Sequence, residues 1–201
     1  MNLSDIEGHL KKFRVGIAGA GGLGSNCAAL LARSGVGTLV IADYDRVEKS
    51  NLSRQFYFTG QEGMMKTEAL KENLYRIRPE TYAIIHSLRL DRKNILQIFS
   101  GCDVIVEALD SSEMKEMFIE TVQTALKVIP LVAGSGIAGW GNNEILKCRK
   151  IDEKLYVCGD ETSEVTDDLP PLAPRVAIVA GMQANTVVEL LMKMNQKLHR
   201  E

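Results

Sequence analysis

Residues 14–24 of this chain read Arg-Val-Gly-Ile-Ala-Gly-Ala-Gly-Gly-Leu-Gly. The first five are typical of a buried parallel strand, and the glycines that follow predict a tight turn into a helix at residues 25–33. Two further glycines end that helix, and residues 38–42 are expected to form a second strand. In this strand–turn–helix–strand context, a glycine fingerprint indicates a nucleotide-binding fold.

The rest of the chain alternates between strand and helix patterns. This alternation predicts a Rossmann-like, doubly wound α/β fold with a mostly parallel sheet and a C-terminal antiparallel extension. The further strands are expected at residues 82–85, 103–108, 131–133, 144–149 and 154–157, the last two being antiparallel. Helices are expected between them at residues 94–99 and 111–127.

Two capping boxes mark predicted helix starts. Ser4 with Glu7 predicts a short helix ending near residue 12, and Thr59 with Glu62 predicts one that runs to residue 77. Residues 159–174 are rich in acids and prolines and are expected to form a loop. The chain ends in a predicted helix with an apolar face formed by Val187, Leu190, Leu191, Met194 and Leu198.

The length and charge of the chain exclude several classes of protein. Its 201 residues suit one α/β domain with a real core, and we expect a single domain over residues 1–201. The charges are interspersed and sum to −2, so no basic field points to nucleic acid or to an anionic membrane. Residues 15–32 are uncharged, but their five glycines argue against a membrane span. Since no signal-peptide pattern is present, a cytoplasmic protein is expected.

The four cysteines predict reduced intracellular thiols and no structural zinc, because no Cys-x-x-Cys pair occurs. Cys27 and Cys102 lie in apolar surroundings and are expected in the core. Cys148 and Cys158 flank the predicted antiparallel strands. Either could be a reactive thiol, although neither has a neighbouring histidine to activate it.

The glycine turn is expected to bind the phosphates of a nucleotide. Gly19 permits the tight turn, Gly21 lets a phosphate approach the backbone, and Gly24 lets the helix pack closely on the strand. Gly22 completes the set, and the helix N-terminus offers free N–H groups and a partial positive charge to an anion. Which nucleotide binds is left open by this motif alone.

Residues 43–55 read Asp-Tyr-Asp-Arg-Val-Glu-Lys-Ser-Asn-Leu-Ser-Arg-Gln. Asp43 ends the second strand, where a carboxylate can accept hydrogen bonds from a ribose, and Asp45 either assists it or faces water. Asn51 and Arg54 are three residues apart, so one helical turn would point both at the glycine turn. Arg54 could then bind phosphate oxygens bidentately, with Gln55 as a further donor. The combination suits a triphosphate better than a nicotinamide cofactor.

Two further residues could complete a phosphate site, and both have simpler explanations. Lys66 lies one turn into the predicted helix, where a lysine either faces solvent or reaches the phosphates. Asp110 ends a strand and is expected to cap the next helix, with Glu113 three residues on. A carboxylate at that edge of a parallel sheet could also hold Mg²⁺, and the two roles are compatible.

Taken together, these residues resemble the ThiF/MoeB/HesA family, the prokaryotic relatives of ubiquitin-activating enzymes. The resemblance covers residues 14–197, nearly the whole chain. Its most specific part is the 43–55 block, which few other families carry. The other matching features are the glycine turn, Lys66, Ala108-Leu-Asp110 and the Ala173-Pro174 start of the last helix. The short chain is most similar to ThiF-type proteins of thiamine biosynthesis.

The resemblance implies an adenylyltransferase that uses ATP and Mg²⁺. A ubiquitin-like sulfur carrier, such as a ThiS-like one, would insert its Gly-Gly tail, and the terminal carboxylate would attack the α-phosphorus and release pyrophosphate. By this resemblance Asp43 would hold the ribose, and Asn51, Arg54 and Lys66 would hold the phosphates. Asp110 would bind Mg²⁺. Arg54, Lys66 and Asp110 would be the catalytic residues, and the protein would be a homodimer.

The chain also departs from the family pattern. The zinc-binding Cys-x-x-Cys pairs of many relatives are absent, and residues 159–174 contain no cysteine for a covalent step. The segment before Gly19 is shorter than the one from which relatives supply an arginine to their partner subunit.

Three other functions stay open. The same fold could adenylate a different acceptor, such as a peptide or a tRNA base. A nicotinamide-dependent oxidoreductase would use Asp43 equally well, although no catalytic Tyr-x-x-x-Lys arrangement is evident. A scaffold that has lost catalysis is the third alternative, against which Arg54, Lys66 and Asp110 together argue.

Overall fold

The computed structural model describes residues 2–194, and within them one seven-stranded sheet is formed. The strands lie in the order β3-β2-β1-β4-β5-β7-β6. Neighbouring strands are parallel except β6 and β7, which are antiparallel. The strands are β1 (Arg14–Ala18), β2 (Thr38–Asp43), β3 (Tyr82–Ser87), β4 (Val104–Glu107), β5 (Leu131–Gly134), β6 (Lys147–Lys150) and β7 (Leu155–Gly159). The predicted α/β fold with its C-terminal antiparallel extension is confirmed.

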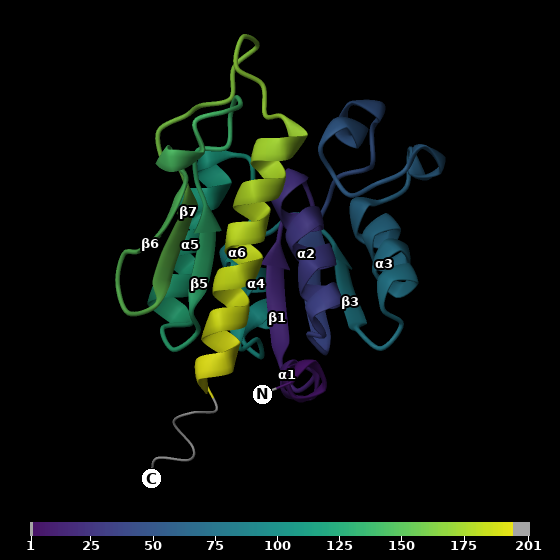
Figure 1. Cartoon of the computed structure of the whole chain (residues 1–201), viewed down its shortest axis with the longest axis vertical. Coiled ribbons are helices and arrows are strands. Elements are labelled where there is room, and N and C mark those ends of the chain that lie inside the picture. Colours follow the sequence, from purple (N-terminus) through teal and green to yellow (C-terminus); the bar gives the residue numbers. More distant parts are fainter. Residues whose placement is uncertain (1, 195–201) are drawn as a thin grey trace.

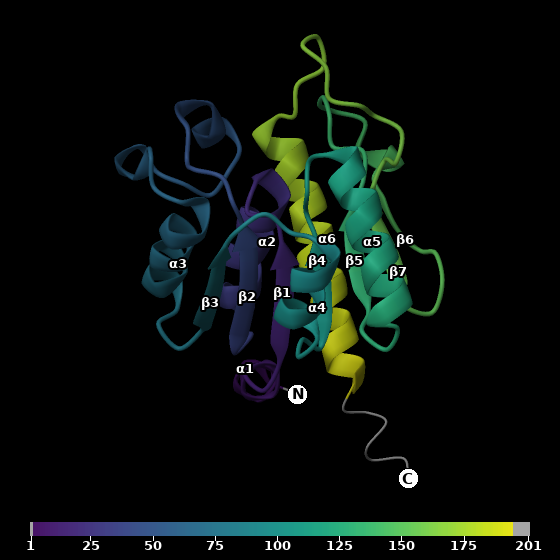
Figure 2. The same ribbon diagram turned by 180° about the vertical axis from the view of Figure 1, so that it is seen from behind.

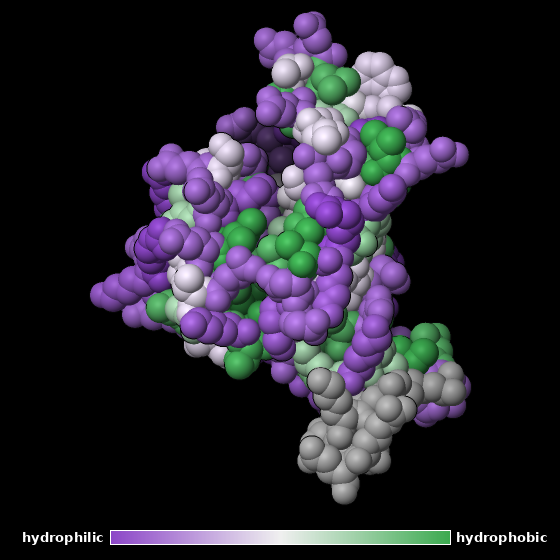
Figure 3. All heavy atoms as spheres, turned by 90° about the vertical axis from the view of Figure 1, so that its left-hand side faces the viewer, coloured by the Kyte–Doolittle hydropathy of each residue, from purple (hydrophilic) through white to green (hydrophobic). Residues whose placement is uncertain are grey.

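Helices cover both faces of this sheet (Figures 1 and 2). α2, α3 and α6 lie on the face seen in Figure 1, and α4 and α5 lie on the face seen in Figure 2. The helices are α1 (Leu3–Leu10), α2 (Gly22–Ser34), α3 (Lys66–Ile77), α4 (Arg92–Phe99), α5 (Ser112–Ala125) and α6 (Ala173–Met194), with short 3₁₀ turns η1 (Lys49–Ser53), η2 (Thr59–Gln61) and η3 (Asn143–Ile145). Hydrophilic side chains cover much of the β6 edge, which faces the viewer in Figure 3.

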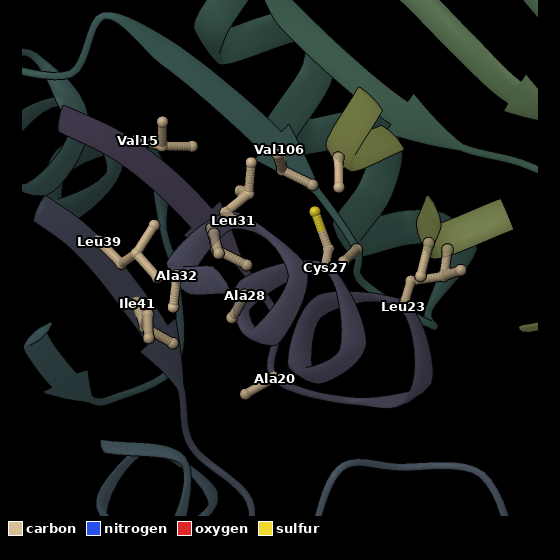
Figure 4. Close-up of a cluster of buried hydrophobic side chains, with 14 of the residues drawn as sticks. Val15, Ala20, Leu23, Cys27, Ala28, Leu31, Ala32, Leu39, Ile41 and Val106 are labelled. Carbon is tan, nitrogen blue, oxygen red and sulfur yellow. The ribbon is translucent and has the colours of Figure 1, made fainter. Parts of the chain in front are cut away.

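The larger core lies between the sheet and the helices of the α2 face (Figure 4). Leu23, Cys27 and Leu31 recur every four residues on α2, so they share the helix face that packs toward strand residues such as Val106. Leu31 is fully buried, and truncating it to alanine would cost about 2–5 kcal/mol. The expected core positions of Cys27 and, in the cluster under α4 and α5, of Cys102 are confirmed.

The first helix has a different cap from the predicted one. The Asn2 side chain accepts a hydrogen bond from the Asp5 N–H at 2.9 Å, and the Asp5 carboxylate accepts one from the Asn2 N–H at 3.1 Å. This capping box starts α1 two residues before the predicted pair of Ser4 and Glu7. Glu7 is instead occupied by an ion pair with Arg78 at 2.8 Å, which ties α1 to the end of α3.

The start of α3 also differs from the prediction, because residues 59–65 do not join the helix. Thr59 begins only the short turn η2, and Gly63 then adopts a φ of +83°, which ends any helical path. Met65 next forms a β-bridge with the segment that follows β2. Lys66 is therefore the first residue of α3, and its N–H donates to the Asp45 carbonyl at 2.9 Å.

α6 carries the predicted apolar face. Val187 and Leu191 are fully buried, and Leu190 and Met194 pack against the same core, while Leu198 lies outside the described residues. Within the described part of the chain, α6 is also the one helix long and apolar enough to cross a membrane. Core helices of soluble proteins pass the same test, and α6 packs along α2 and the sheet as such a helix does.

Candidate functional site

A cavity of about 540 Å³ opens at the carboxyl edge of the sheet. β1, β2 and β4 end at this edge, and β1 lies between the other two at the point where the strand order reverses. Open α/β sheets bind their ligands at such a switch point. The cavity wall includes most of the residues that the sequence singles out: Gly19, Gly21, Gly22, Asp43, Asp45, Arg54, Gln55, Lys66 and Asp110.

The glycine turn brings backbone segments into close contact and leaves one open position. Gly19 has a φ of +93°, and a Cβ there would lie 2.6 Å from the Ala108 carbonyl oxygen. A Cβ on Gly24 would lie 1.9 Å from the Gly19 carbonyl oxygen, so only glycine allows this packing. At Gly21 the added Cβ would meet nothing nearer than Gln55 Nε2 at 3.9 Å. The space at Gly21 is therefore available to a ligand.

The N-terminus of α2 lies at the same cavity. α2 begins three residues earlier than predicted, and Gly21 at its N-cap supplies no side-chain hydrogen bond. The first N–H groups of a helix have no partner within it, which is why helix N-termini bind anions. Ser25 and Asn26 anchor the next part of the wall. Ser25 Oγ accepts from the Phe56 N–H at 2.9 Å, and Asn26 Nδ2 donates to the Arg54 carbonyl at 3.0 Å.

Asp43 ends β2 with its carboxylate held by the backbone. One oxygen accepts from the Ala20 N–H at 2.6 Å and the other from the Asp45 N–H at 2.7 Å. Burial raises the pKa of Asp43 above its ordinary value, and the two N–H groups oppose that shift. Each carboxylate oxygen has a second acceptor position, so Asp43 can still accept hydrogen bonds from a ribose.

Lys66 and Asp45 form an ion pair in the cavity wall. Lys66 Nζ lies 2.8 Å from Asp45 Oδ2, and the exposed fractions of the two side chains are 7% and 40%. The solvent-facing alternative for Lys66 is therefore wrong. Because Lys66 is the first residue of α3, the start of that helix fixes where the ammonium group lies.

Arg54, Gln55 and Asn51 follow one another closely, but only the first two line the cavity. Arg54 Nη1 donates to the Ser50 carbonyl at 3.2 Å. Gln55 Oε1 is buried and has no hydrogen-bond partner among the described residues, so this amide is available to a ligand. The Asn51 side-chain oxygen accepts from the Glu48 N–H at 3.1 Å and closes the η1 turn that presents Arg54. A phosphate contact by Asn51 stays a prediction.

Asp110 follows β4 and its carboxylate is open to the cavity. The predicted helix cap is wrong, because the N-cap of α5 is Ser111, whose side chain accepts from the Met114 N–H. Asp110 is exposed and has no hydrogen bond or ion pair to any residue between 2 and 194. Within the same range no three His, Cys, Asp or Glu side chains are placed to hold a metal by themselves. Asp110 suits the way proteins bind Mg²⁺, through one or two carboxylates together with substrate phosphates.

Tyr57 supports the site and was not predicted. Its hydroxyl donates to the Ala20 carbonyl at 2.6 Å and lies 3.3 Å from the Lys66 carbonyl. Burial, with Asp43 and Asp45 nearby, raises the pKa of Tyr57 above its ordinary value. The phenol therefore stays protonated and joins the glycine turn to the start of α3. The only signal in the sequence is an aromatic residue two positions after the 43–55 block.

A buried ion pair beside the cavity was also missed. Glu107 is fully buried, and Lys115 Nζ lies 2.5 Å from its Oε2 and donates to the Gly134 carbonyl at 2.7 Å. The other Glu107 oxygen accepts from the Leu109 N–H at 2.8 Å. These bonds fix the chain as it leaves β4, just before Asp110. An acid at the end of an otherwise apolar strand was the available signal.

Arg175 anchors the two loops that close the cavity. It is 6% exposed, and Nη1 lies 2.8 Å from Asp160 Oδ2 and 3.0 Å from the Ala138 carbonyl oxygen. Asp160 in turn accepts hydrogen bonds from two N–H groups of its own loop at 2.9 and 2.7 Å. The 159–174 loop is thus held at its start, and its Val165 and Pro171 line the cavity. A single arginine at the start of an apolar helix gave no indication of this role.

The chain belongs to the ThiF family, which it matches over residues 4–200. The family resemblance predicted from the sequence is therefore confirmed. The chain is 32% identical over 197 residues to the adenylyltransferase and sulfurtransferase MOCS3 of Caenorhabditis briggsae, covering 94% of this chain and 48% of that protein. It is 29% identical over 194 residues to the molybdopterin-synthase adenylyltransferase of Salmonella typhimurium, covering 93% of this chain and 77% of that protein. The chain thus spans about half the length of the first of these relatives.

Solved structures share the fold. The E. coli tRNA N6-threonylcarbamoyladenosine dehydratase TcdA in complex with ATP matches with a TM-score of 0.84 at 21% identity, covering 98% of this chain and 91% of that chain. Its complex with AMP gives a TM-score of 0.85 at 20% identity, with coverages of 96% and 91%. At these identities the similarity establishes the fold alone.

Proposed function

We propose that this protein is an ATP-dependent adenylyltransferase that activates the C-terminal glycine of a ubiquitin-like, ThiS-like sulfur carrier, in the thiazole branch of thiamine biosynthesis. The observation that carries the proposal is the meeting of the glycine turn, Asp43, Arg54, Lys66 and Asp110 in one cavity. Their groups match the phosphates, ribose and metal of Mg·ATP. The ThiF family match and two relatives named as adenylyltransferases support the reaction class.

In the proposed reaction the chain positions and neutralises its substrates and supplies no nucleophile. One oxygen of the carrier's terminal carboxylate bonds to the α-phosphorus, the bond from that phosphorus to the bridging oxygen breaks, and pyrophosphate leaves with the electron pair. Asp43 would hold the ribose, while Arg54 and Lys66 would balance the charge on the phosphates. Bound Mg²⁺, held by Asp110, would polarise and orient phosphate oxygens. A terminal carboxylate is already ionised at neutral pH, so no general base is needed.

The charges in the cavity explain why further positive charge would be required. Two cations, Arg54 and Lys66, face the three carboxylates of Asp43, Asp45 and Asp110. Lys66 is also paired with Asp45, so a bound phosphate would exchange one anionic partner of the ammonium group for another. Mg²⁺ and a cation from the carrier or from a second copy of the chain would complete the balance. We propose that a second copy of the chain supplies this cation in a homodimer, and we place the protein in the cytoplasm.

Exchange of labelled pyrophosphate into ATP tests the proposal. The purified chain receives Mg·ATP, labelled pyrophosphate and a ThiS-like carrier, and matched reactions contain that carrier without its last two glycines, a carrier of another sulfur pathway, or none. Exchange should require the intact ThiS-like carrier. Exchange with the other carrier alone would refute the thiamine role and leave adenylation standing. Absence of exchange with every carrier would refute the proposed function.

Adenylation of another acceptor is the second candidate, and the TcdA-like fold makes tRNA the acceptor to test. The net charge of −2 is interspersed and provides no basic field for tRNA, which favours the carrier. Incubation with α-labelled ATP and total tRNA decides between them, because transfer of the label to tRNA without a carrier would select the second candidate. The family match gives no support to a nicotinamide-dependent oxidoreductase.

A further inference from the structure

Two cysteines face each other at the edge of the sheet, away from the residues that line the cavity. Cys148 lies in β6, the last strand of the sheet, and Cys158 lies directly opposite in the antiparallel strand β7. Directly opposed residues of an antiparallel pair project from the same face of the sheet. Thr186 of α6 contacts both sulfur atoms, so that face is the one covered by α6.

The separation of the two cysteines suits a covalent bond between them. The Sγ atoms lie 2.7 Å apart, with the Cys158 thiol donating a hydrogen bond to the Cys148 sulfur. Directly opposed residues of antiparallel strands have Cα atoms about 4.5–5.5 Å apart, which falls within the range of about 4.4–6.8 Å that disulfides span. A bond between the two sulfurs would therefore require little movement of either strand.

The two thiols differ in exposure and in pKa, as the attacking and the resolving cysteine of a reactive pair do. Cys148 is exposed and Cys158 is fully buried. The hydrogen bond from Cys158 lowers the pKa of Cys148 to about 6, helped by Thr186 and opposed by partial burial and by Glu189. The same hydrogen bond and burial raise the pKa of Cys158 above its ordinary value. Cys148 is thus the accessible thiol of the pair and the one that loses its proton more readily, while the buried Cys158 keeps its proton.

We propose that Cys148 and Cys158 form an oxidative modification site that a hydroperoxide converts into a cross-strand disulfide. The Cys148 thiolate attacks the terminal peroxide oxygen and the O–O bond breaks, giving a sulfenic acid at Cys148. Hydroxide leaves when the oxidant is hydrogen peroxide, and an alkoxide leaves when it is an organic hydroperoxide. The Cys158 sulfur then attacks the Cys148 sulfur, and the S–O bond breaks. The thiol proton leaves with the oxygen as water. The peroxide is reduced by two electrons, and the two thiols are oxidised by two.

The remaining cysteines serve as internal controls. Cys27 and Cys102 are buried, and burial raises their pKa values to about 12 and about 11. A small excess of hydrogen peroxide should therefore leave both as thiols while it oxidises the exposed Cys148. General oxidation of the protein would also modify Cys27 and Cys102, so modification of these two residues would reveal it.

Peptide mapping of the full-length chain locates the bond. The chain is treated with hydrogen peroxide, its remaining thiols are alkylated, and it is digested with trypsin without reductant. Lysine and arginine residues separate the two cysteines, so cleavage places Cys148 in the dipeptide Cys-Arg and Cys158 in the peptide of residues 155–175. We expect these two peptides to be linked by a disulfide that dithiothreitol releases. The oxidised chain should also have a higher denaturant midpoint than the reduced one, because the bond ties β6 to β7.

Substitutions keep the test decisive. Cys158→Ala should give no linked peptide and leave the Cys148 sulfenic acid to be trapped by dimedone. Loss of the hydrogen-bonding thiol should also shift the pH profile of Cys148 alkylation to higher pH. A wild-type chain whose main product is a dimedone adduct, a bond to Cys27, or a bond between two copies of Cys148 would overturn the proposal. Unreacted wild-type thiols under conditions that oxidise free cysteine would overturn it equally.

Discussion

Replacing Lys66 with methionine should slow carrier-dependent adenylation far more than it destabilises the fold. The Lys66 side chain is 7% exposed, and its ammonium reaches the cavity wall from the first residue of α3. Methionine keeps an unbranched apolar side chain and removes the charge. Loss of one preorganised donor from a site of developing negative charge costs about 2.7–4 kcal/mol, or roughly 10²–10³ in rate.

The effect on folding should be smaller because the partner of Lys66 is partly exposed. Asp45 is 40% exposed, so water can solvate its carboxylate once the ammonium is gone. Ion pairs with access to solvent contribute about 0–1 kcal/mol. We therefore expect the free energy of unfolding to fall by about 1 kcal/mol, measured from the denaturant midpoint at constant slope.

Pyrophosphate exchange and urea unfolding, measured on the same preparations, check both halves of this prediction. Lys71→Met is the matched control, because Lys71 lies exposed on the same helix and should change neither quantity. The reasoning is refuted if Lys66→Met exchanges within about threefold of the wild type. It is also refuted if the variant loses activity only in proportion to the fraction that is unfolded.

Three further predictions concern the glycine turn, Asp110 and the loop that Arg175 holds. Gly21→Ala should fold normally yet bind ATP more weakly in calorimetry, whereas Gly24→Ala should lower the denaturant midpoint; equal midpoints would contradict the packing at Gly24. Asp110→Asn should reduce magnesium-dependent exchange roughly 10²-fold, and an unchanged magnesium titration would remove Asp110 from the site. Burial alone would raise the pKa of Asp160. Hydrogen bonds from backbone N–H groups and the charge of Arg175 outweigh this effect, so the pKa of Asp160 is lowered. The stability it contributes is present above its unfolded-state pKa of about 3.9 and is lost as pH falls through the lower folded value. Asp160→Asn should flatten this acid limb of unfolding free energy, and an unaltered limb would argue against the ion pair.

The parts of the site that could be predicted from the sequence depend on local constraints. The glycine turn follows a buried strand and precedes a helix, so the order of elements alone places it at the carboxyl edge of the sheet. Asp43 is placed by the same logic, because it ends the neighbouring parallel strand. Arg54 and Gln55 line the cavity as expected. In each case the secondary structure and the topology restrict where the side chain can lie.

The misplaced helix starts have a different cause. At residues 59–66 the local capping pattern was present, but Gly63 and the β-bridge of Met65 to the segment after β2 decided where α3 begins. Asp110 and Ser111 both suit an N-cap, and the structure uses Ser111. Because both residues favour the N-cap position, the sequence does not show which of them caps the helix. The choice matters here because it leaves the Asp110 carboxylate open to the cavity.

The buried polar contacts could not be predicted because no local sequence pattern pairs their members. Glu107 and Lys115 are 8 residues apart and Asp160 and Arg175 are 15 apart, and each pair meets only when the elements that carry it pack together. Glu107 meets Lys115 across a strand–helix junction, and Arg175 meets Asp160 across the loop between β7 and α6. A buried charge is tolerated only with such a partner, so each pair restricts the arrangement of the elements that it joins. Both pairs adjoin the cavity and neither reaches into it. The two ion pairs therefore hold the strand end and the loops beside the cavity, whereas Asp43, Arg54, Lys66 and Asp110 line the cavity itself.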